Sequence, residues 1–122
     1  MTQSTARILV VGHDSGDADL VRRLLKDEHA SVDVSTDPER YAADFDRCRP
    51  QVLVLAFRSL EETERYYLGL YRNSTQVNAT AHRTLILCGR DEVVRAYELC
   101  RDTYFDDYVL FWPMSQDGRR LP

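Results

Sequence analysis

The sequence predicts an α/β fold in which a parallel sheet carries helices on both faces. Short apolar runs alternate with amphipathic, helix-like segments in the order β-α-β-α-β-α-β-α-β, an alternation typical of right-handed crossovers between parallel strands. The most apolar of these runs, 8–11 and 52–57, contain no polar residue, as expected for strands buried on both faces. A chain of 122 residues, 43% of them hydrophobic, suffices for one such domain and is too short for two.

The first strand is predicted at residues 7–11, because the run Ile8–Val11 is entirely apolar. The polar residues before it, 1–6, are predicted to be a disordered N-terminus. A turn at 12–17, which contains two glycines and two aspartates, leads into a helix. Apolar spacings of three and four predict its buried face, which consists of Ala18, Val21, Leu24 and Leu25.

The second strand, at 31–35, alternates apolar and polar residues and is therefore predicted to be an edge strand or a strand that is half exposed. Asp37 and Pro38 predict a helix start, because aspartate is a good N-cap and proline is favoured at the first helical position. The buried stripe of this helix is predicted to be Tyr41, Phe45 and Cys48. The third strand, at 52–57, is the most apolar and is expected at the sheet centre.

A capping box at residues 59–62 predicts the third helix. On this helix Tyr66 is expected to be exposed. The expected buried stripe is Thr63, Tyr67, Leu70 and Tyr71. A polar loop at 73–83 follows the helix.

The fourth strand is predicted at 84–88, and the fourth helix begins at Asp91. The inward positions of this helix are expected to be Val93, Ala96, Tyr97 and Cys100. The fifth strand is predicted at 107–111 and ends at Trp112 and Pro113.

The composition argues against several classes of function. The net charge is −4 and there is no basic block, so nucleic-acid binding is not expected. The longest apolar run, 52–57, is too short to span a membrane, and no signal peptide is evident. Three cysteines without a C-x-x-C pair and three scattered histidines predict reduced thiols and no metal or other cofactor. A cytoplasmic domain is therefore expected.

The fold class also predicts where a site would lie. In open parallel sheets, ligands bind beyond the carboxyl ends of the strands, where the strand order reverses. For a five-stranded sheet of order 2-1-3-4-5, that place lies beyond strands one and three. The residues there and after strands four and five are Gly12, His13, Asp14, Ala56, Phe57, Arg58, Cys88, Gly89, Phe111 and Trp112.

Three segments, at 6–11, 50–55 and 105–109, have an order and separations that resemble the receiver domain of bacterial response regulators. The resemblance covers nearly the whole chain. It implies a flavodoxin-like fold of five parallel strands in the order 2-1-3-4-5, with a receiver-like domain at 7–113. It also implies a fifth helix, for which the polar tail 114–122 is too short. The tail is expected to be a cut, a linker or the start of that helix.

An active receiver carries an acidic pair that holds magnesium, a phosphate-accepting aspartate, a threonine or serine, and a lysine. The matching positions, in that order, are Gly12 and His13, Ala56 or Phe57, Cys88, and Phe111. None of these side chains has a carboxylate that could accept a phosphoryl group, and none replaces the oxygen ligands that magnesium needs. The chain is therefore identified as a degenerate receiver without catalytic residues. Asp14, the one nearby acid, is interpreted as a turn or helix-capping residue. Tyr108 matches the family's aromatic switch position.

The expected function is that of a non-phosphorylatable signalling module without enzymatic activity, in bacterial two-component signal transduction. Such a module would contact a protein partner, its own output domain or a second copy in a homodimer, as the N-terminal regulatory domain of a longer protein. Neither nucleic acid nor membrane is an expected partner. The resemblance implies an interaction face at Tyr97, Tyr104, Tyr108 and Trp112.

Two alternatives are weighed against this function. The substituted pocket around Cys88 and Phe111 is apolar and would suit a small ligand, and Cys88 would suit a redox sensor because Arg90 and a helix start lie close by. An enzyme of the nucleotide-binding type is disfavoured, since the turn at 12–16 is neither a G-x-G-x-x-G motif nor a P-loop.

Overall fold

The computed structural model describes residues 4–102 and 105–112 and confirms the predicted sheet. Its five strands are all parallel and lie in the order β2-β1-β3-β4-β5. The strands are β1 (Ser4–Val11), β2 (His29–Ser35), β3 (Val52–Leu55), β4 (Arg83–Gly89) and β5 (Asp107–Trp112). The α-helices are α1 (Ser15–Lys26), α2 (Tyr41–Cys48), α3 (Leu60–Asn73) and α4 (Val93–Arg101), with 3-10 turns η1 (Pro38–Arg40) and η2 (Arg90–Glu92).

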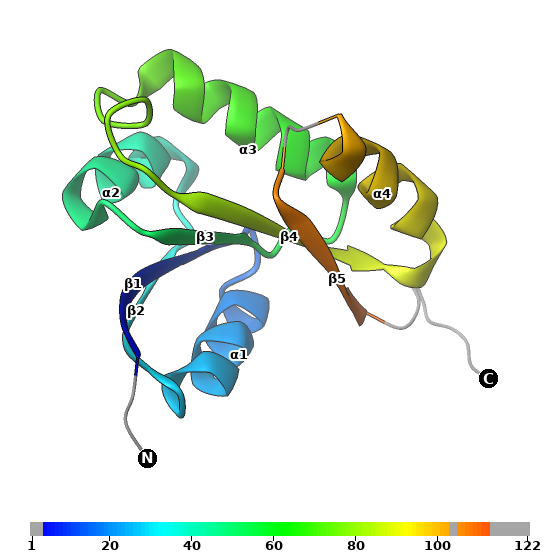
Figure 1. Ribbon diagram of the computed structural model, residues 1–122, viewed down its shortest axis with the longest axis horizontal. Helices are drawn as coiled ribbons and strands as arrows, with labels where there is room; N and C mark the ends of the chain where they lie inside the picture. The colour runs from blue at the N-terminus through cyan, green and yellow to red at the C-terminus, as the bar shows by residue number, and fades with distance from the viewer. Residues whose placement is uncertain (1–3, 103–104, 113–122) are drawn as a thin grey trace.

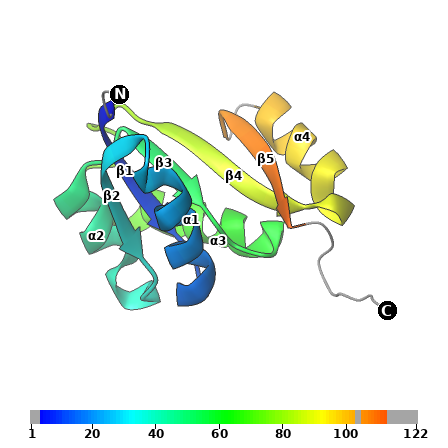
Figure 2. The same cartoon turned by 90° about the horizontal axis from the view of Figure 1, so that it is seen from below.

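The sheet separates two layers of helices. Figures 1 and 2 show α2, α3 and α4 on one face and α1 on the other. The α2–α4 core consists of Leu9, Val11, Phe45, Leu53, Leu55, Phe57, Leu60, Tyr66, Leu70, Val77, Ile86, Cys88, Ala96, Leu99 and Phe105. The α1 core consists of Ile8, Val10, Ala18, Val21, Val32, Val54, Ala56, Leu87 and Trp112. Successive residues of β1 therefore enter opposite cores, which explains why its apolar run does not alternate with polar residues.

Strand ends differ from the sequence-based expectations. β1 begins at Ser4, where it pairs with His29 at the start of β2, so residues 4–6 belong to a strand and not to a disordered N-terminus. β3 ends at Leu55, two residues earlier than predicted, although Ala56 and Phe57 stay buried. The expected domain end at 113 and the tail 114–122 lie outside the described residues.

Single positions on three helices differ from the predicted stripes, whose other members are buried or pack against the cores. Leu24 of α1 is exposed. On α3, Tyr66 is buried and Tyr71 is exposed, the reverse of the expectation. Tyr97 of α4 points to solvent, whereas Leu99 is buried. Adjacent helix positions lie about 100° apart, and tertiary contacts decide which of two neighbouring apolar residues, such as Leu24 and Leu25 or Tyr66 and Tyr67, lies closer to the sheet.

Asp46 on α2 holds the connection between α3 and β4. Its carboxylate accepts hydrogen bonds from the Ser74 hydroxyl, from the Thr75 hydroxyl at 3.1 Å and from the Gln76 amide at 3.2 Å. Burial raises the pKa of this carboxyl, but the hydrogen bonds outweigh burial and leave the pKa below its usual value. These bonds hold the connection in place, and its own residue Val77 is buried in the α2–α4 core.

We expect Asp46→Asn to lower the free energy of unfolding by about 1 kcal/mol at neutral pH. Because the folded-state pKa is lowered, the carboxylate's contribution is present above the unfolded-state pKa of about 3.9 and is lost as the pH falls through the folded-state value. Urea unfolding of both proteins between neutral pH and acid should show the difference shrinking below about pH 4. Asp27→Asn, at the exposed end of α1, is the control, and a difference that stays constant over this range would refute the assignment.

Candidate functional site

The predicted pocket residues lie at the carboxyl edge of the sheet, but on two different faces. Ala56 belongs to the α1 core and Phe111 packs against it, whereas Phe57 and Cys88 belong to the α2–α4 core. In β5, Leu110 pairs with Cys88 and Trp112 pairs with Gly89, so Phe111 is the extra residue of a β-bulge. The structure thus does not bring Cys88 and Phe111 into one pocket.

Gly12 stands where the backbone leaves no room for a side chain. A Cβ atom built on it would lie 2.9 Å from the carbonyl oxygen of Ala56. Its amide donates to the Ser35 carbonyl at 3.2 Å, and its carbonyl accepts from the Tyr41 hydroxyl at 3.3 Å. This close approach of the turn after β1 to the end of β3 explains the glycine and excludes an acidic side chain at this position.

The two residues after Gly12 are exposed, and one of them is the cap of α1. The Asp14 carboxylate accepts from the Gly16 amide at 2.7 Å and from the Asp17 amide at 3.1 Å. The hydrogen bonds from the Asp17 and Gly16 amides hold the pKa of Asp14 below its usual value. Asp14 is therefore the helix cap that the sequence predicted, while the adjacent His13 borders a groove described below.

An ion pair that was not predicted from the sequence lies at the carboxyl edge of the sheet. Arg58, which follows β3, donates two hydrogen bonds to Asp17 of α1, at 2.7 and 2.9 Å. The guanidinium carbon also lies 5.7 Å from the ring centroid of Trp112 in β5, within the range of a cation–π contact. We call these three residues the Asp17–Arg58–Trp112 clasp. It connects α1, the β3–α3 connection and β5.

Cys88 has the properties of a packed thiol. Its side chain is fully buried, and burial, followed by the negative charges of Glu92 and Asp91, raises the pKa of the thiol. A reactive cysteine needs the opposite shift, so the burial argues against a redox role. In residues 4–102 and 105–112 there is no group of three or more His, Cys, Asp or Glu side chains that would hold a metal ion.

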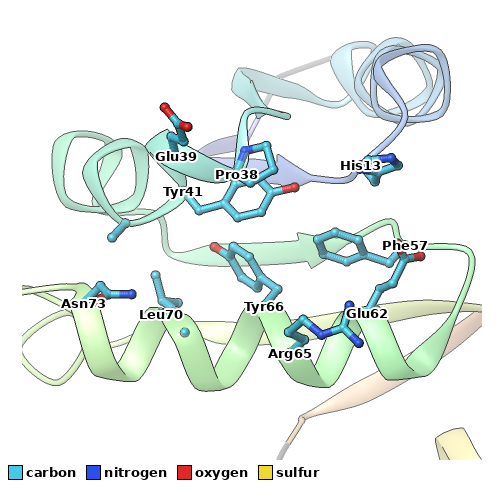
Figure 3. Close-up of a pocket in the computed structure, with 12 residues that line it drawn as sticks. His13, Pro38, Glu39, Tyr41, Phe57, Glu62, Arg65, Tyr66, Leu70 and Asn73 are labelled. Atoms are coloured by element: carbon cyan, nitrogen blue, oxygen red, sulfur yellow. The ribbon is translucent and has the colours of Figure 1, made fainter.

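A groove of about 670 Å³ extends along α3 from the carboxyl ends of β1 and β3, where His13 and Phe57 line it, to Asn73 at the end of the helix. It runs between η1 and α2 on one side and α3 on the other (Figure 3). Three packed rings line it: Tyr66 lies 5.0 Å from Tyr41 and 5.7 Å from Phe57, measured between centroids. Charged side chains stand around them, namely His13, Glu39, Glu62 and Arg65. The strand order reverses between β1 and β3, so the end of the groove at His13 and Phe57 lies where ligands bind in open α/β sheets.

Sequence reasoning found this place but not its walls. His13 and Phe57 were predicted at the strand ends, and both line the groove. Tyr41 and Tyr66 were missed as groove residues because one was assigned to the core and the other to solvent. The signal available in the sequence was the presence of aromatic residues on two helices that both start beyond the same sheet edge.

The predicted interaction face is only partly on the surface. Tyr97 is 54% exposed and Tyr108 is half-buried, but Trp112 is buried in the clasp. Tyr104 lies outside the described residues. Apolar side chains that were not part of the predicted interaction face are exposed on α4 and β5, namely Val94, Val109 and Leu110. The exposed part of this face is therefore more aliphatic than predicted.

Comparisons with known proteins add information on the fold alone. No family model matches the sequence, and no curated protein matches it. Among solved structures, the chain is similar to a fusion of the yeast Spc42 trimeric coiled coil with another protein, at 15% identity and a TM-score of 0.65, over 97% of this chain and 73% of that one. Within the described residues, no helix combines the length and apolarity needed to cross a membrane.

Proposed function

We propose that the chain is a receiver-like signalling module that takes no phosphoryl group and acts through protein contacts. The observation that carries the proposal is that the residues at the carboxyl ends of β1 and β3 have no acidic side chain and no room for one. Gly12 has no room for a side chain, and Ala56 is 1% exposed within the α1 core. Phosphoryl transfer to a protein of this kind needs a carboxylate nucleophile, and magnesium needs oxygen ligands. The two positions that the receiver resemblance assigns to this chemistry supply neither.

The Asp17–Arg58–Trp112 clasp suggests how such a module works without phosphorylation. It joins the start of α1, the end of β3 and the end of β5, which correspond to three of the four places where the family it resembles carries its phosphorylation residues. A permanent ion pair there stabilises one arrangement of these segments. The module would then present a constant surface to its partner.

The surface formed by α4 and β5 is the contact region that the exposed side chains favour. Tyr97, Val94 and Leu110 project from these elements. Aromatic and aliphatic anchors of this kind contribute most of the affinity in protein interfaces. The proposed partner is a second copy of the chain or an output domain of the same protein, in the cytoplasm of a bacterium.

Light scattering over a range of protein concentrations tests both parts of this proposal. We expect the mean molar mass to rise with concentration and to stay unchanged when magnesium and beryllium fluoride, a phosphoryl analogue, are added. Tyr97→Ser should weaken association about tenfold or more. Tyr71→Ser, an exposed tyrosine on α3, is the matched control. A monomer at all concentrations would refute a second copy as the partner, and a response to the analogue would refute the loss of phosphorylation chemistry.

A further inference from the structure

We propose that the groove between η1–α2 and α3 binds a small, planar, phosphate-free ring compound that is neutral or cationic and accepts a hydrogen bond from Tyr66. A module that acts by protein contact needs no such ligand, so this proposal is independent of the proposed function.

The first observation is the Tyr66 hydroxyl. The side chain is 5% exposed, and its oxygen has no hydrogen-bond partner among the described residues. Buried hydroxyls of this kind nearly always have a partner. Figure 3 shows the oxygen pointing from α3 toward η1 and α2, into the groove. Because burial raises the pKa of Tyr66, the hydroxyl stays protonated and can donate a hydrogen bond to a ligand.

The second observation is Gly69, one turn further along α3. Glycine is disfavoured inside helices, and no glycine of the described residues has the positive φ that would require one. A Cβ atom at position 69 would meet no described atom within 4 Å, so packing within the chain does not explain the residue either. Its effect is to widen the groove that it lines.

The shape and lining of the groove favour a flat ring. Tyr41 meets Tyr66 at an interplanar angle of 79° and Phe57 at 89°. Because Tyr66 and Phe57 are buried and Tyr41 is half-buried, Tyr41 is the ring that can meet a ligand with its face or its edge. Planar aromatic ligands gain from contacts of either kind. The volume of about 670 Å³ lies within the range of about 300–1,000 Å³ that is usual for small-molecule sites.

The charges around the groove disfavour a phosphate group. Glu39 and Glu62 both line it. The Arg65 guanidinium is shared with Glu61, whose carboxylate lies 3.8 Å away. The amides at the start of α1, the usual place for a phosphate in such folds, already donate to Asp14. The ligand is therefore neutral or cationic.

Ligand-observed NMR titration tests the proposal with adenosine, caffeine and 4-aminoquinoline as phosphate-free probes, and with AMP as the anionic counterpart of adenosine. We expect at least one phosphate-free probe to bind, and any binding of AMP to be weaker than that of adenosine. Tyr66→Phe should weaken probe binding about fivefold, as expected for the loss of one hydrogen bond. Gly69→Leu should block the groove, and Gly69→Ala, which adds a single methyl group to open space, should retain most of the binding.

Neither Tyr66→Phe nor Gly69→Leu should lower the melting temperature, because one removes an unpartnered hydroxyl and the other replaces a helical glycine. Amide shifts of the wild-type protein provide a readout that depends on no variant, and probe-induced shifts centred on Tyr41, Tyr66 and Gly69 would support the site. Binding by none of the three probes would overturn the proposal. Equal binding to the Gly69→Leu variant, shifts centred elsewhere, or tighter binding of AMP than of adenosine would overturn it as well.

Discussion

Ala56→Asp, which restores a carboxylate where a receiver would carry its phosphate acceptor, is expected to lower the free energy of unfolding by about 3–5 kcal/mol at neutral pH. Ala56 is fully packed in the α1 core, and the carbonyl of the same residue lies 2.9 Å from where a Cβ on Gly12 would be. The cation nearest in sequence, Arg58, is already bound to Asp17. A new carboxylate would be buried without a counter-charge. Urea unfolding measures the loss.

The charge can be separated from the added volume. Ala56→Asn has nearly the same shape and no charge, so it should lose clearly less stability than Ala56→Asp. Burial would raise the pKa of the new carboxyl in the folded state, so the penalty of ionisation should be full above that raised value and fall away toward the unfolded-state pKa of about 3.9. The two variants should therefore converge in acid. Equal losses at neutral pH would show that position 56 tolerates a charge and would weaken the argument against phosphorylation.

The arrangement of strands could be predicted because it depends on local patterns. The run Ile8–Val11 has no polar member, and the structure sends its alternate residues into two cores. The same logic correctly placed 52–55 at the sheet centre. The helix caps could also be predicted from short segments. The side chains of Asp14, Asp37 and Ser59 each accept hydrogen bonds from backbone amides at the start of the helix that follows.

The site could be predicted less well because its residues are brought together by tertiary contacts. Asp17 and Arg58 are 41 positions apart, and neither residue alone indicates an ion pair. The supposed pocket of Cys88 and Phe111 failed because strand positions alternate between faces and a bulge shifts the register at Phe111. Tyr66 was misplaced because Tyr66 and Tyr67 are adjacent, and apolar spacing alone does not decide between them.

Arg58→Met is expected to lower the free energy of unfolding by about 1–3 kcal/mol. Solvent around the largely exposed Arg58 side chain screens the ion pair, so we expect a loss toward the lower end of this range. The variant keeps most of the apolar stem but leaves the Asp17 carboxylate, whose side chain is only 11% exposed, without its counter-charge. It also removes the cation from the face of Trp112. Urea unfolding measures the loss, and the fluorescence of Trp112, the chain's single tryptophan, reports the change at β5.

A double-mutant cycle with Asp17→Asn separates the pair from its surroundings. If the clasp joins α1 to the β3–α3 connection, the double variant should lose less stability than the two single losses combined. Arg47→Met is the matched control: Arg47 is exposed and pairs with the buried Asp44, but Asp44 keeps a hydrogen bond from the Ser35 hydroxyl at 2.8 Å. Its loss should therefore be smaller than that of Arg58→Met. Additive losses in the cycle, with unchanged Trp112 fluorescence, would mean that the clasp does not couple these segments. The constant conformation we infer for the module would then need another source.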